Sequence, residues 1–389
     1  MNEKNPTRRA ALAIGAATVA AAHLAPDAAL AAVGASDAGN KLVQDPRIDP
    51  RIKAVYGNFP PTRFPDVPNR EAGLEWDRQD QAKAKGQPSI MRRPTVDYEA
   101  VVPSTGLAIR TEHVVSSPDG NTINLLTMVP EGPGPWPCVY YIHGGGMIIS
   151  SCYDASFQAW GRQLAHAGVA VVMVDFRNAL RPSSVPEIAP FPAGLNDCVS
   201  GLRWLRTNTA RLNVDPNRII VAGESGGGNL SVATALKLKR DGDLRIIRGV
   251  FVMCPYLAGA WPLEPGSSAL LNDGILMGAH SNFNQMVYGM EAFQQRNPLA
   301  WPGFAAEADV TGFPPVVINV NECDPLRDDG VKLYRLLLRS GVTADCRMIM
   351  GTVHATETNV TMCPEISRQA ARDIAGFCRD VSRPAVPAA

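Results

Sequence analysis

Three features of this 389-residue chain predict an α/β fold with a mostly parallel sheet covered by helices on both faces. Short apolar, β-branched runs alternate with helical segments over the second half of the chain, as they do in successive βαβ units. The runs read as buried strands, which is typical of parallel sheets. Glycine, serine, aspartate and histidine follow the ends of several runs, at the edge where an open α/β sheet carries its reactive groups.

The composition is that of a globular protein and argues against several kinds of partner. Hydrophobic residues make up 46% of the chain, charged residues make up 19%, and the formal net charge is zero. Because the chain has no basic run, we expect no nucleic-acid partner. The eight cysteines include no Cys-x-x-Cys pair, so we expect no metal site. An exported protein could still form one or two disulfides.

Residues 1–31 have the layout of an export signal. Lys4, Arg8 and Arg9 precede an alanine-rich apolar stretch at 10–22, and small residues recur at 29–31. The arginine pair resembles a twin-arginine signal, and the stretch is too short and too rich in alanine for a membrane span. The alternative is a disordered alanine-rich tail. A functional signal predicts a periplasmic or secreted protein without an integral membrane segment; otherwise we expect a cytoplasmic protein.

The segment after the signal, 36–110, predicts an N-terminal arm with a helix at 70–85. Two strands at 112–115 and 122–129 flank the turn residues 118–121 and predict an antiparallel hairpin. We assign 32–389 to one α/β domain, to which the arm belongs.

Strands and helices then alternate. We expect strands at 137–142, 169–175, 218–221, 246–254, 316–320 and 345–350, and helices at 155–167, 194–210, 229–240, 331–339 and 364–381. The interval 257–313 contains no clear strand, but it is too long for a structureless loop in a compact domain. We predict that it forms a helical cap over the strand ends, in contact with the N-terminal arm.

The sequence Gly223-Glu224-Ser225-Gly226-Gly227 lies between a predicted strand and a predicted helix, and it is the strongest functional signal in the chain. A strand, Gly-x-Ser-x-Gly and a helix in this order form a nucleophile elbow, a sharp turn that exposes the serine hydroxyl. The flanking glycines remove the Cβ atoms that would clash in that turn. Ser225 is therefore the candidate nucleophile.

A serine nucleophile needs a base and an acid that orients the base. Asp324 follows the strand at 316–320, and His354 follows the last strand, so each has the required position. Glu322 and Asp328 are competing acids. Asp328 falls in the first turn of a predicted helix, where a carboxylate favours the helix dipole, and we prefer Asp324.

The sequence His143-Gly144-Gly145-Gly146 directly follows a predicted strand. Glycines let backbone N–H groups approach a substrate oxygen closely, and the N–H after the nucleophile belongs to Gly226. We expect an oxyanion hole that uses these amides. His143 is interpreted as a structural residue that holds the loop by hydrogen bonds.

Together these motifs resemble the hormone-sensitive-lipase branch of the α/β-hydrolases over residues 110–380. The segments 174–180 and 190–198 are similar to that family as well. The resemblance implies an α/β-hydrolase fold with a cap, carboxylester hydrolysis, no cofactor, and oxyanion donors at Gly144, Gly145 and Gly226. The family usually has Asp or Thr where this chain has Glu224, Ala where it has Gly226, and Gly-Phe where Ala355 and Thr356 follow the histidine.

The favoured function is hydrolysis of a small ester through Ser225, His354 and Asp324, with short-to-medium acyl chains expected from the resemblance alone. One alternative is a non-catalytic small-molecule-binding protein on the same fold. Another is an amidase or peptidase. A homodimer is compatible with the sequence, which does not determine the oligomeric state.

Overall fold

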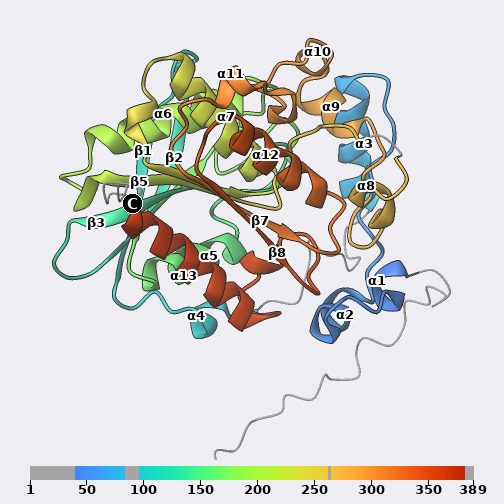
Figure 1. Cartoon of the computed structure of the whole chain (residues 1–389), viewed down its shortest axis with the longest axis horizontal. Coiled ribbons are helices and arrows are strands. Elements are labelled where there is room, and N and C mark those ends of the chain that lie inside the picture. Colours follow the sequence, from blue (N-terminus) through green and yellow to red (C-terminus); the bar gives the residue numbers. More distant parts are fainter. Residues whose placement is uncertain (1–39, 84–95, 262–263, 382–389) are drawn as a thin grey trace, which may run out of the picture. The chain divides into compact units, whose positions relative to one another are not determined.

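The computed structural model describes residues 40–83, 96–261 and 264–381, and the predicted export signal lies outside them. An eight-stranded sheet has the order β1-β2-β4-β3-β5-β6-β7-β8 (Figure 1). The first two pairs in this order, β1–β2 and β2–β4, are antiparallel, and all later pairs are parallel. The strands are β1 (Leu107–Val115), β2 (Thr122–Pro130), β3 (Trp136–Ile142), β4 (Ala170–Asp175), β5 (Val214–Glu224), β6 (Gly249–Met253), β7 (Val316–Asn321) and β8 (Ala344–Ile349).

Helices cover both faces of the sheet, as the alternating pattern predicts (Figure 1). Two of them, α5 (Ala155–His166) and α13 (Pro364–Asp380), pack their apolar side chains on one face. The other face packs against α6 (Ala193–Thr207), α7 (Gly226–Arg240) and α12 (Arg327–Arg339). The α/β-hydrolase fold class expected from the sequence is confirmed.

The central strand β5 brings the elbow to the edge of the sheet where the parallel strands end. Its residues Ile219 to Ala222 are fully buried, because β3 and β6 flank the strand and helices cover both of its faces. Gly223 pairs with Ile142 of β3, and Glu224 pairs with Met253 of β6. The loops that follow these three strands therefore emerge side by side.

Glycines at the elbow let the start of α7 lie directly against β3. A Cβ atom on Gly227 would sit 2.0 Å from the carbonyl oxygen of Ile142, and one on Gly223 would sit 2.5 Å from the same atom. No larger residue fits at either position without moving backbone.

The described part of the interval 257–313 contains several short helices joined by turns, and it contacts the N-terminal arm. It contains α8 (Ser268–Leu271), α9 (Phe283–Tyr288), α10 (Met290–Gln294), the 3-10 turn Pro302–Phe304 and α11 (Glu307–Val310). The arm contributes α3 (Arg70–Lys83), whose Trp76 lies edge-on to Phe283 with ring centres 5.2 Å apart. Phe64 stacks on the same ring at 4.7 Å. These aromatic contacts join two segments that are distant in the sequence.

The first part of the arm forms a small core of its own. It contains α1 (Lys41–Gln44) and α2 (Pro50–Tyr56), whose Leu42 and Ile52 are buried together with Cys323 and Val353. A further short helix, α4 (Tyr98–Val101), precedes β1, and 3-10 turns lie at Leu244–Ile246 and Thr356–Thr358.

All eight cysteines, which lie in the described residues, are free, so the one or two disulfides that an exported protein could form are not seen. Seven of them are buried, where a thiol packs as a small hydrophobic group. Within the described parts of the chain, no helix has the length and apolar character needed to cross a membrane.

Candidate active site

Ser225 lies at the turn between β5 and α7 with φ 55° and ψ −120°. A non-glycine residue with this backbone is strained, and such strain persists only where the surroundings hold it. Here the Ser225 N–H donates to the carbonyl oxygen of Met253 (3.0 Å), and its carbonyl oxygen accepts from the N–H of Tyr256 (3.0 Å). The loop after β6 therefore fixes the elbow from one side.

A continuous hydrogen-bond chain links Ser225, His354 and Asp324. The Nε2 atom of His354 lies 2.8 Å from the Ser225 hydroxyl oxygen, and its Nδ1 atom lies 2.8 Å from Oδ2 of Asp324. Asp324 is fully buried, and its Oδ1 atom accepts from the N–H of Leu326 (2.9 Å). Burial lowers the pKa of His354, but the charge of Asp324 and the hydrogen bond to it outweigh this effect, so the pKa lies above its usual value.

The loops that carry Asp324 and His354 are tied to each other and to the segment 257–313. The side-chain amide of Asn272 donates to the carbonyl oxygens of Glu322 (3.2 Å) and Asp324 (3.0 Å). The Cys323 N–H donates to the carbonyl oxygen of Thr352 (2.9 Å). Helices α1 and α2 pack on Cys323 and Val353, the residues just before the acid and the base. The N-terminal arm therefore supports both loops.

The two competing acids point elsewhere. Glu322 accepts from the N–H of Gly351 (2.8 Å), and Asp328 accepts from the N–H of Ser268 (2.8 Å). Asp328 also lies in the first turn of α12, as predicted. Of the three candidates, Asp324 is the one in contact with His354.

The glycine loop after β3 differs from the expectation at one position. The N–H of Gly144 donates to Oε1 of Glu224 (2.6 Å), so this amide is already occupied and we correct its assignment as an oxyanion donor. The next two residues, Gly145 and Gly146, have φ values of 104° and 63° and turn the backbone toward the elbow. A Cβ atom on Gly226 would sit 2.7 Å from the nitrogen of Gly146, so these two backbones are nearly in contact.

His143 has the structural position inferred from the sequence. Its Nδ1–H donates to the carbonyl oxygen of Gly144 (2.8 Å), and its ring stacks on Phe176 with centres 4.4 Å apart. Burial lowers the pKa of His143, which favours the neutral ring. Both ends of the Gly144 residue are thus held, its carbonyl oxygen by His143 and its N–H by Glu224.

Three buried groups near the base were not singled out as site residues. Glu224 also accepts a hydrogen bond from the hydroxyl of Tyr141, and burial raises its pKa to about 7. Glu357, three residues after His354, accepts from the side-chain amide of Asn321 (2.8 Å), and burial raises its pKa as well. Cys254 directly follows β6. In the sequence only the short spacing from His354 pointed to Glu357, and nothing indicated its burial.

Cys254, Asp324 and His354 form a group with ligand atoms within 4.8 Å of one another. Their chemistry fits a protein hydrogen-bond network better than a metal site. His354 already uses Nδ1 for Asp324 and Nε2 for Ser225, and burial keeps the pKa of the Cys254 thiol well above its usual value. A metal ion needs the deprotonated thiol and a free ring nitrogen.

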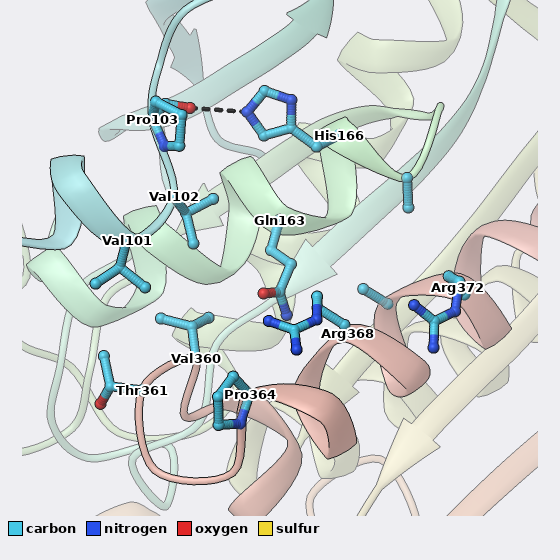
Figure 2. Close-up of a pocket in the computed structure, with 12 residues that line it drawn as sticks. Val101, Val102, Pro103, Gln163, His166, Val360, Thr361, Pro364, Arg368 and Arg372 are labelled. Atoms are coloured by element: carbon cyan, nitrogen blue, oxygen red, sulfur yellow. Dashed lines mark hydrogen bonds between the residues drawn. The ribbon is translucent and has the colours of Figure 1, made fainter. Parts of the chain in front are cut away.

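A cavity of about 660 Å³ lies between α5, α13 and the segment before β1, and Figure 2 shows its lining. None of the three residues of the hydrogen-bond chain lines it. Two of its polar groups are bonded within the protein, since Gln163 donates to Ser367 (2.6 Å) and the His166 ring donates to the carbonyl oxygen of Pro103 (2.8 Å). The candidate active site is therefore the Ser225 edge of the sheet and not this cavity.

Comparisons with known proteins agree with the fold. A family model described as the alpha/beta hydrolase fold matches residues 139–358, more than half of the chain. Carboxylesterase NlhH of Mycobacterium tuberculosis is 28% identical over 346 residues, which cover 87% of this chain and 97% of the relative. An arylesterase of Saccharolobus solfataricus is 31% identical over 250 residues, covering 62% and 74%.

Solved structures of esterases are similar over almost the whole described chain. The structure of esterase Est22 has a TM-score of 0.82 and 49% identity, covering 87% of this chain and 100% of its own. Brefeldin A esterase, titled a bacterial homologue of human hormone-sensitive lipase, has a TM-score of 0.76 and 32% identity, covering 88% and 96%.

Proposed function

The chain belongs to the α/β-hydrolase fold family, and we propose that it is a serine carboxylesterase in which Ser225, His354 and Asp324 form the catalytic triad. The observation that carries this proposal is the hydrogen-bond chain from the serine hydroxyl through the imidazole to the buried carboxylate. Relatives named carboxylesterase and arylesterase, and the esterase Est22, support the same chemistry.

In the first half of the reaction, the Ser225 oxygen attacks the ester carbonyl carbon while Nε2 of His354 takes the hydroxyl proton. Asp324 accepts a hydrogen bond from Nδ1–H of His354, and the proton stays on Nδ1. This keeps Nε2 free as the base and stabilises the imidazolium that forms. The tetrahedral intermediate then collapses, the C–O bond to the alcohol breaks, and Nε2 gives its proton to the leaving alkoxide. The products of this half are the alcohol and an acyl-serine.

In the second half, water attacks the acyl carbon and His354 again takes a proton. The intermediate expels the Ser225 oxygen, which regains its proton from His354, and the carboxylic acid leaves. In both halves the negative charge on the former carbonyl oxygen needs donors fixed in advance. We assign this role to the N–H groups of Gly145, Gly146 and Gly226, because the Gly144 amide is bonded to Glu224.

The test is the hydrolysis of p-nitrophenyl butyrate by the wild type and by Ser225→Ala, with Ser340→Ala as a matched control. The Ser340 hydroxyl bonds to the carbonyl oxygen of Leu336 at the end of α12, far from the elbow in the sequence. We expect Ser225→Ala to lose about 10⁴-fold or more in kcat and the control to keep full activity. A fluorophosphonate should label the wild type and the control but not Ser225→Ala. A pure Ser225→Ala sample that still hydrolyses the ester would contradict the proposal.

Two finer points belong to the same proposal. Short-to-medium acyl chains are the expected substrates, and a series of p-nitrophenyl esters from acetyl to palmitoyl tests this; a maximum at palmitoyl would contradict it. The twin-arginine-like pattern at residues 1–31 supports export. Fractionation of cells that express the full chain, compared with a variant carrying Arg8→Lys and Arg9→Lys, tests whether the pattern directs transport.

A further inference from the structure

Glu224 connects the nucleophile elbow to the glycine loop that precedes it by eighty residues. It is the last residue of β5, and its side chain is 2% exposed. One carboxylate oxygen accepts from the N–H of Gly144 (2.6 Å), and the other accepts from the hydroxyl of Tyr141 on β3. A buried carboxylate with both oxygens bonded is held in one orientation.

The contact with Gly144 is tight enough to fix the course of the loop. A Cβ atom on Gly144 would sit 2.7 Å from Oε1 of Glu224 and 3.2 Å from its carbonyl oxygen. The carbonyl oxygen of Gly144 is held from the other side by His143. With this residue fixed, the directions of the next two amides, those of Gly145 and Gly146, follow from their left-handed φ values of 104° and 63°.

We propose that Glu224 is a positioning residue for ester hydrolysis, which holds the Gly144 amide and thereby aims the Gly145 and Gly146 amides at the substrate carbonyl oxygen. This inference rests on the proposed esterase activity. Glu224 does not touch the substrate; it acts through the loop. Oxyanion donors stabilise the transition state only when they are fixed at the right distance, and a displacement of about 1 Å can reduce the rate about 10²-fold.

The protonation of Glu224 supplies a readout that a purely structural role lacks. Burial raises its pKa to about 7, while the bonds from Tyr141 and Gly144 act in the opposite direction. The other titratable groups that face it are His354 and Cys254. When protonated, the carboxyl donates to the Tyr141 oxygen and holds the Gly144 amide only as a neutral acceptor, which makes a weaker bond than a carboxylate does.

Glu224→Gln copies this neutral state at every pH, because its carbonyl can accept from Gly144 and its amide can donate to Tyr141. We therefore expect kcat/KM of the wild type and the Gln variant to be nearly equal at acid pH. Their ratio should rise to about tenfold above pH 7, since charge-assisted hydrogen bonds are about twice as strong as neutral ones. The charge of Glu224 also raises the pKa of His354, so the His354 limb of the Gln variant should lie at lower pH, and the ratio is taken after the His354 titration of each enzyme has been fitted separately. Glu224→Ala should lose about 10²-fold in kcat with little change in KM.

Tyr141→Phe provides a second, conservative test that does not depend on the fold of the Ala variant. It removes a bond that lowers the pKa of Glu224, so the pKa should rise and the acid limb of kcat/KM should move to higher pH. The activity at the alkaline plateau should stay within about threefold of the wild type, because the Gly144 bond remains.

The experiment uses the full chain and p-nitrophenyl butyrate. Three results would support the positioning role of Glu224. The ratio of kcat/KM between the wild type and Glu224→Gln changes with pH, the acid limb shifts in Tyr141→Phe, and Glu224→Gln is more active than Glu224→Ala. A ratio that does not change with pH, or a Gln variant as slow as the Ala variant, would overturn the inference while the esterase activity of the wild type stands. A wild type that does not hydrolyse the ester would instead overturn the proposed function.

Discussion

Replacing Asp324 with Asn tests the role of the buried acid, because the structure determines how the new amide must orient. Oδ1 of Asp324 accepts from the N–H of Leu326 (2.9 Å), so the carbonyl oxygen of an Asn has to take that side. The amide NH₂ then faces Nδ1 of His354, which must accept instead of donate. The ring proton moves to Nε2, and an Nε2–H cannot take the proton of Ser225.

The size of the effect follows from the wrong tautomer. The equivalent change in a Ser-His-Asp protease lowers kcat about 10⁴-fold, and we expect a similar loss here. Since each factor of ten is about 1.4 kcal/mol, the loss corresponds to about 5 kcal/mol of transition-state stabilisation. The overall fold should change little, because Asn has the shape of Asp and keeps the bond to Leu326.

The assay is kcat and kcat/KM for p-nitrophenyl butyrate, with thermal unfolding to verify the fold. Glu322→Gln is the matched control, because Glu322 is two residues away and bonds to the N–H of Gly351 instead of the imidazole. It should keep kcat within about threefold of the wild type. The reasoning is refuted if Asp324→Asn retains a tenth of the wild-type kcat, or if Glu322→Gln loses more activity than Asp324→Asn.

Three further predictions concern stability. The pKa of Glu224 is about 7 in the folded chain and 4.5 in the unfolded one. Its contribution to the free energy of unfolding is therefore fully present below pH 4.5, and about 3 kcal/mol of it is lost as the pH rises through 7. Glu224→Gln should flatten this part of the profile of unfolding free energy against pH. Asp329→Ala should destabilise the chain by about 3 kcal/mol in urea unfolding, because it leaves the N–H groups of Leu257, Ala258 and Trp261 without their acceptor; an unchanged midpoint would contradict this. Ile52→Ala should cost about 3 kcal/mol and also lower kcat, whereas Val43→Ala, at a 45% exposed position on α1, should change stability by less than about 0.5 kcal/mol; equal effects of the two would refute the support that we assign to the arm.

The strands and helices that a local sequence pattern can identify were predicted correctly. The hairpin, the parallel strands and their covering helices lie where the apolar runs placed them, and β5 and α7 flank Ser225 as the elbow motif requires. These features depend on periodicity and on short glycine motifs, which are properties of neighbouring residues. The expected resemblance to the hormone-sensitive-lipase branch is also confirmed, by the similarity to brefeldin A esterase.

The features of the site that were not predicted from the sequence depend on contacts between residues distant in the chain. That the Gly144 amide is occupied follows only from the side chain of Glu224, which reaches it because β3 and β5 are neighbours. The burial of Glu357 depends on Asn321 at the end of β7, which is 36 residues earlier. Neither pairing has a local signature, so the family resemblance assigned Gly144 as an oxyanion donor although its amide is bonded to Glu224.

The hydrogen bonds of the buried acids explain why Asp324 and not a neighbour orients the base. Glu224 and Glu357 are both fully enclosed, and burial raises the pKa of each. In a low-dielectric site, a carboxylate is tolerated only where a cation or several donors compensate it. Asp324 has His354 on one oxygen and the N–H of Leu326 on the other, whereas Oε1 of Glu357 has no hydrogen-bond partner among the described residues. The imidazolium that forms during ester attack therefore has Asp324 in direct contact, and Glu224 and Glu357 also raise the pKa of His354.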